Sequence, residues 1–175
     1  MDKDSLINQL EHIKNNYIIG LAAFSVFSSG KSYPLLNTHL ATFGEYTVSF
    51  DQLTRLLQNS RDRDIALNEF LKMLMRTLIK ESFENIKDYC TLTEQYDAFK
   101  AEPWYEFGRI IRNFLSHNCR FEFNKYDKER LPISWKGRAI TIEMDRTTVG
   151  MNFFGNVETW ELFQEFYNFV ENRLK

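Results

Sequence analysis

The sequence contains little that makes turns, linkers or cross-links: seven glycines, three prolines and two cysteines among 175 residues. So few glycines and prolines argue against a β-sandwich and against a linker-rich chain. Cys90 and Cys119 are too few and too isolated for a disulfide framework, which favours reduced thiols in a cytoplasmic protein. The histidines (His12, His39 and His117) match no metal-ligand spacing, so the sequence predicts neither a metal nor a cofactor.

A run long enough to cross a membrane is also missing. The most apolar stretch, 17–27, is shorter than a membrane-spanning helix. Asp2, Asp4 and Glu11 precede it, where a signal peptide would be basic. We therefore expect no membrane segment and interpret 17–27 as the buried part of a helix over residues 5–28.

Apolar and aromatic side chains are abundant. They make up 43% and 15% of the residues, so we expect a sizeable core in one domain, 1–175. The pattern Thr91-Leu92-Thr93-Glu94 has the form of a capping box and predicts a short helix up to Lys100. Helical spacing of apolar residues predicts further helices over 51–59, 65–89, 102–118 and 157–174.

Three segments depart from the helical pattern. Residues 29–49 form a long connection, with 46–50 in an extended form, and the charged run 61–64 is interpreted as a solvated turn. Over 133–154, apolar and polar residues alternate with breaks at Gly137 and Asp145-Arg146, which predicts a small antiparallel sheet.

The predicted fold is therefore mainly α, with a small β element late in the chain. We expect a bundle of about five or six helices over 5–118. A basic loop and β-hairpin over 119–155 follow it, and a C-terminal helix over 157–174 ends the fold.

The helix over 102–118 places polar side chains opposite a buried stripe. At about 100° per residue, Arg109, Asn113 and His117 share one face, and Arg112 lies next to Ser116. Asn118 follows, and asparagine tolerates the left-handed conformation past a helix end. The apolar stripe consists of Phe107, Ile110, Ile111, Phe114 and Leu115.

The run Arg112-Asn113-Phe114-Leu115-Ser116-His117 resembles the Arg-(four to six residues)-His motif of the HEPN superfamily, including the polar residue after the arginine. HEPN domains are small helical bundles. Many are metal-independent ribonucleases of toxin–antitoxin and anti-phage systems, and others only bind partners. The resemblance implies Arg112, His117 and Asn113 as catalytic residues, supported by Arg109, Ser116 and Asn118. It also implies a homodimer, an RNA substrate and a cognate antitoxin protein as a possible partner.

Metal-free RNA cleavage needs residue types that this motif contains. A base must take the 2′-hydroxyl proton, an acid must protonate the departing 5′-oxygen, and positive charge must stand beside the phosphorus. Histidine titrates near neutral pH, and arginine keeps its charge and can hold two phosphate oxygens. The structural alternative is that His117 favours a helix C-terminus and Arg112 is a surface residue.

Positive charge is concentrated between Arg109 and Arg138. This segment has eight lysines and arginines against three acidic residues, whereas the whole chain has a net charge of −2. Within it, from Arg120 to Leu131, basic residues are interleaved with Phe121, Phe123 and Tyr126, a mixture that can contact RNA phosphates and bases. A solvated loop whose aromatic residues pack on the core explains the same pattern, and so does a non-catalytic module that binds RNA or an acidic protein. The candidate RNA contacts are Arg120, Lys125, Lys128 and Arg130.

Overall fold

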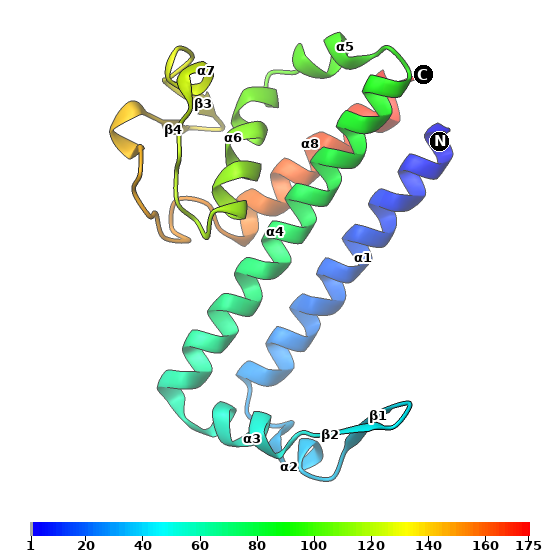
Figure 1. Ribbon diagram of the computed structural model, residues 1–175, viewed down its shortest axis with the longest axis vertical. Helices are drawn as coiled ribbons and strands as arrows, with labels where there is room; N and C mark the ends of the chain where they lie inside the picture. The colour runs from blue at the N-terminus through cyan, green and yellow to red at the C-terminus, as the bar shows by residue number, and fades with distance from the viewer. Residues whose placement is uncertain (1) are drawn as a thin grey trace. The chain divides into compact units, whose positions relative to one another are not determined.

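The computed structural model describes residues 2–175, most of which are helical (Figure 1). The prediction of a mainly helical fold with a small antiparallel hairpin before the last helix is confirmed. The longer helices are α1 (Lys3–Ser28), α3 (Asp51–Gln58), α4 (Ser60–Leu92), α6 (Tyr105–Ser116) and α8 (Asn156–Arg173). The short ones are α2 (Tyr33–Leu36), α5 (Tyr96–Lys100) and α7 (Lys125–Lys128). The hairpin consists of β3 (Ile133–Trp135) and β4 (Arg138–Ile140), followed by the 3-10 helix η1 (Ile142–Met144).

The chain divides into two compact units. The larger contains the residues up to Tyr17 together with Met75–Lys175, and the smaller is Ile18–Leu74. Both boundaries fall inside long helices, α1 and α4, rather than in a linker. The single domain over 1–175 stays a prediction. No helix in residues 2–175 is long and apolar enough to span a membrane.

The larger unit has an aromatic core to which four helices contribute. Phe83 of α4 lies 5.1 to 5.8 Å, between ring centroids, from Phe99 of α5, Tyr105 of α6 and Phe166 of α8. Helix α6 approaches α8 closely at Gly108, where a Cβ atom would lie 3.2 Å from the ring of Phe166. The whole apolar stripe predicted for α6 is buried. Packing on both sides thus holds the motif helix in place.

The smaller unit contains a second hairpin that the sequence pattern did not predict. Strands β1 (Leu40–Phe43) and β2 (Tyr46–Ser49) pair antiparallel, with Leu40 opposite Ser49. We expected only 46–50 to be extended, within an irregular connection. Nearly all of the hairpin is exposed, so it lacks the alternation of buried apolar and exposed polar residues that marks a strand in a sequence.

The charged run 61–64 is helical, which corrects the prediction of a solvated turn. Helix α4 begins at Ser60, because Oδ1 of Asn59 accepts the backbone N–H groups of Arg61 and Asp62. Asparagine is among the preferred residues for capping the N-terminus of a helix. The α6 helix, in turn, begins at Tyr105, later than the predicted start near Glu102.

The predicted burial of 17–27 is wrong, because most of these residues are half-buried or exposed, with Ile19 66% exposed. Two other local predictions hold only in part: the short helix up to Lys100 and a two-stranded sheet are present. The hydroxyls of Thr91 and Thr93 donate to carbonyls one turn back, at Lys87 and Tyr89, instead of forming a capping box, and α4 continues through Leu92. The alternating pattern after β4 does not continue the sheet, because residues 142–144 form η1.

Candidate functional site

The C-terminus of α6 carries the predicted motif and is held by an arginine of α4. His117 is the C-cap residue. Arg76 donates from Nε to the carbonyl oxygen of Leu115 (2.7 Å) and from Nη2 to Oδ1 of Asn118 (2.9 Å). A helix cannot satisfy its own last carbonyls, and its C-terminus carries partial negative charge. Arg76 therefore caps α6 and fixes the position of the motif.

The chain reverses direction directly after His117. Asn118 and Cys119 both have left-handed backbone conformations, with φ of 55° and 59°. Asparagine tolerates this conformation, as predicted for Asn118. For cysteine it costs about 1–3 kcal/mol, so the surrounding structure must impose it. The N–H of Cys119 donates to the carbonyl of Phe114 (3.0 Å), and its side chain is buried.

The reversal brings residues 119–123 beside residues 145–149. The N–H of Phe121 donates to the carbonyl of Thr147 (3.0 Å), and the N–H of Arg146 donates back to the carbonyl of Phe121 (2.8 Å). Arg120 and Thr148 form an antiparallel bridge. Two segments that are distant in sequence thus meet beside the end of α6.

His117 lies at this end with its side chain about half exposed (52%). Its Nδ1 is 3.6 Å from Oε2 of Glu122, and Oε1 of the same glutamate is 3.9 Å from Nε of Arg120. At 3.6 Å this contact is too long for a hydrogen bond, so the carboxylate lies beside the imidazole without fixing its tautomer. The motif pattern gave no indication that Glu122 lies beside His117.

Arg112 is more enclosed, with 23% of its side chain exposed. Its Nη1 lies 3.1 Å from Oε1 of Glu84, and its guanidinium carbon lies 5.3 Å from the ring centroid of Phe83. Its Nε is buried and has no hydrogen bond within residues 2–175. Both motif residues are therefore held by carboxylates, but by different ones.

The three polar residues predicted beside the motif are placed differently. Ser116 donates its hydroxyl to the carbonyl of Arg112 (2.9 Å), so it is engaged within the helix. Asn118 accepts the hydrogen bond from Arg76. Asn113 is partly buried, on the turn between Arg112 and His117.

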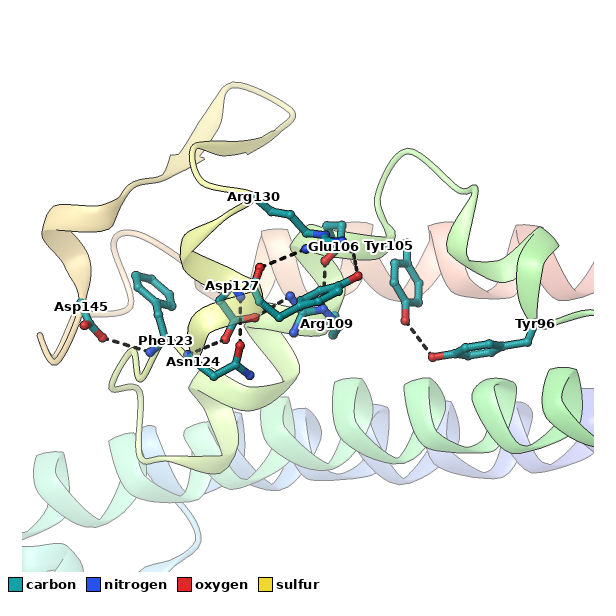
Figure 2. A network of polar contacts seen from close by, with 10 residues as sticks. Tyr96, Tyr105, Glu106, Arg109, Phe123, Asn124, Asp127, Arg130 and Asp145 are labelled. Atoms are coloured by element: carbon teal, nitrogen blue, oxygen red, sulfur yellow. Dashed lines mark hydrogen bonds and ion pairs between the residues drawn. The ribbon is translucent and has the colours of Figure 1, made fainter.

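Arg109 belongs to a separate network that ties α6 to α7 (Figure 2). Its Nη2 lies 2.5 Å from Oδ1 of Asp127, its Nε donates to Glu106 (2.9 Å), and its guanidinium lies 4.8 Å from the ring centroid of Tyr126. Asp127 also closes a capping box with Asn124 at the start of α7. Burial alone would lower the pKa of Arg109, but Asp127 and Glu106 outweigh it and raise that pKa. We therefore interpret Arg109 as a structural residue.

The predicted basic face is largely neutralised. All eight lysines and arginines from Arg109 to Arg138 lie within 4.0 Å of a carboxylate oxygen. The net charge counted within 109–138 does not reveal this neutralisation, because most of the acidic partners lie outside the segment. Among the predicted RNA contacts, Arg130 pairs with Glu106 and Lys128 with Asp145, and the pairs of Arg120 and Lys125 are longer, at 3.9 Å. The partners outside the segment are Glu84, Glu106, Asp145, Glu158, Glu161 and Glu165.

Among residues 2–175, no three His, Cys, Asp or Glu side chains are grouped so that they could hold a metal ion. Comparisons with protein-family models, with curated proteins and with solved structures give no significant match to this chain. The resemblance to the HEPN superfamily therefore rests on the motif and the predicted helical layout.

Proposed function

We propose that this protein is a HEPN-like, metal-independent endoribonuclease that cleaves RNA through attack by the 2′-hydroxyl. The observation that best supports the proposal is His117, which is exposed at the end of α6 with Nδ1 facing Glu122. An exposed imidazole beside a carboxylate suits a general base or acid. The turn that follows it is held by Arg76 and contains two left-handed residues, as strained functional sites often do.

In the proposed reaction, Nε2 of His117 takes the proton of the 2′-hydroxyl. The 2′-oxygen bonds to phosphorus, the bond from phosphorus to the 5′-oxygen breaks, and a proton is delivered to that oxygen. The products are a 2′,3′-cyclic phosphate, or the phosphate formed by its hydrolysis, and a 5′-hydroxyl. One chain offers a single histidine at this position, so a two-fold homodimer would supply a second for the acid.

Arg112 would stabilise the charge that builds up on the phosphate. A guanidinium has five N–H donors, and Glu84 occupies Nη1. The ion pair thus orients the planar group and leaves other donors for phosphate oxygens. Asn113, one turn before His117, would support the phosphate or the imidazole.

The alternative is a non-catalytic module that binds RNA or an acidic protein, such as an antitoxin, through the basic face. The structure supports it less well, because carboxylates neutralise that face. A binding module should keep its activity in His117→Ala and lose it when Arg120, Lys125, Lys128 and Arg130 are neutralised together.

The deciding experiment incubates the purified protein with total RNA and with a tRNA pool, in EDTA. Loss of a general acid–base lowers rates by about 10²–10⁴-fold, so His117→Ala should abolish visible cleavage. Arg112→Ala should also do so, through the loss of charge stabilisation. His12→Ala is the matched control, since His12 is an exposed histidine of α1. Equal cleavage by all four proteins would contradict the proposal, and so would no cleavage by any of them.

Light scattering tests the dimer separately. The expected mass is twice the 20.9 kDa of the chain. A monomer at the concentration of the cleavage assay would contradict the proposed second histidine, even if RNA is cleaved.

A further inference from the structure

An open cavity lies directly beside the candidate site. Its volume is about 320 Å³, and it is lined by Arg120, Glu122, Phe123, Asp145 and Arg146. Such a volume falls at the lower end of small-ligand pockets. Glu122 lines the cavity and also faces His117, so this one side chain lies between the cavity and the imidazole.

The two carboxylates of the cavity are already engaged. Asp145 lies 2.7 Å from Nζ of Lys128 and accepts the backbone N–H of Phe123 (3.0 Å). The Lys128 ammonium, followed by that N–H, holds the pKa of Asp145 below its usual value. Glu122 faces both His117 and Arg120. Neither acid is therefore left to repel an incoming anion at full strength.

Arg146 differs from the eight basic residues of the 109–138 segment. Its side chain is exposed, and its guanidinium forms no salt bridge or hydrogen bond with the described residues, 2–175. The backbone of Arg146 is nevertheless fixed, because its N–H donates to Phe121 (2.8 Å) in a left-handed turn with φ of 60°. The guanidinium of Arg146 thus stands on the cavity wall without a direct ion-pair partner, although the neighbouring Asp145 feels its charge, and Arg120 lines the same cavity.

We propose that Arg146 and Arg120 form a phosphate subsite that holds the RNA strand at a phosphate next to the one cleaved at His117. The subsite rests on the proposed function. One guanidinium group can bind two phosphate oxygens at once, and it keeps its charge at all relevant pH values. Phe123, the only aromatic residue of the wall, is 92% buried and offers no stacking platform. The subsite therefore contacts the backbone of the strand and contributes affinity without base preference.

The test measures binding without cleavage. A fluorescent 2′-O-methyl RNA oligonucleotide, which has no attacking hydroxyl, is titrated with the full chain over a series of salt concentrations. The slope of log affinity against log salt is negative, and losing one phosphate contact on a single strand should make it less steep by about 0.7. Arg146→Gln should show this shallower slope, together with a roughly tenfold weaker affinity at low salt.

Arg61→Gln removes the same charge from an exposed position in the first turn of α4, in the other compact unit. It should keep the wild-type slope. If Arg146→Gln also keeps the wild-type slope and affinity, or if the wild type does not bind the oligonucleotide, the subsite is refuted.

The binding assay and the cleavage assay test the two proposals independently. Binding that depends on Arg146 in a protein that cleaves no RNA would support the subsite and refute the nuclease. Cleavage by a wild type whose binding is indifferent to Arg146→Gln would support the nuclease and refute the subsite. A change in Arg146→Gln equal to that in Arg61→Gln would show a general charge effect and also refute the subsite.

Discussion

The ion pair between Arg109 and Asp127 joins α6 to α7, and Asp127→Asn tests its importance for stability. The two side chains are 12% and 2% exposed, and Nη2 and Oδ1 lie 2.5 Å apart. Neither atom makes a hydrogen bond with any other group in residues 2–175. Asparagine keeps the shape of the side chain and an oxygen for the capping box with Asn124, so the substitution removes the charge and sets an amide NH2 group opposite the guanidinium.

Removing one partner of a buried ion pair costs about 3–5 kcal/mol, because the other charge stays buried without compensation. Arg109 would keep Glu106 at 2.9 Å and the ring of Tyr126. We therefore expect a loss at the low end, about 3 kcal/mol. That is a large part of the roughly 5–15 kcal/mol by which domains of this kind are stable.

Urea unfolding followed by circular dichroism gives the free energy of unfolding by linear extrapolation. The matched control is Asp97→Asn, since Asp97 is 95% exposed and pairs with Lys100 at the surface. That variant should unfold like the wild type. A loss below about 1 kcal/mol in Asp127→Asn, typical of a surface pair, would refute the reasoning.

A double-mutant cycle with Arg109→Met isolates the pair itself. If the two charges compensate each other, Asp127→Asn should cost much less in the Arg109→Met background than in the wild type. Equal costs in the two backgrounds would show that Asp127 acts through its capping box with Asn124 and not through Arg109.

Two further predictions concern the surroundings of the motif. Arg76→Met should lower the free energy of unfolding by about 1–2 kcal/mol and speed hydrogen exchange in the last turn of α6, because the carbonyl of Leu115 loses its donor. Unchanged exchange there would contradict the capping role. The second prediction concerns pH: the pKa of Asp145 lies below its ordinary value of 3.8, mainly through Lys128. The stabilisation it contributes is therefore present above about pH 4 and is lost as the pH falls through the lowered pKa. The amide signal of Phe123 in NMR spectra should follow this titration, and in Asp145→Asn it should not.

The sequence by itself determined the features that depend on neighbours along the chain. The apolar stripe of α6 follows from helical spacing, and the left-handed turn at Asn118 follows from the residue type. The mainly helical fold and the hairpin before α8 follow from periodicity as well. The short hairpin over 40–49 could not be predicted in this way, because its residues are exposed on both faces.

The tertiary structure alone decided which groups surround the motif. Arg76 lies 39 residues before the carbonyl that it caps, and Glu84 reaches Arg112 from another helix. Arg146 looked like no more than a turn residue until backbone pairing placed it in the cavity beside Arg120. The net charge of a segment likewise says little about its surface, because ion pairs form between residues that are close in space, whatever their separation in the chain.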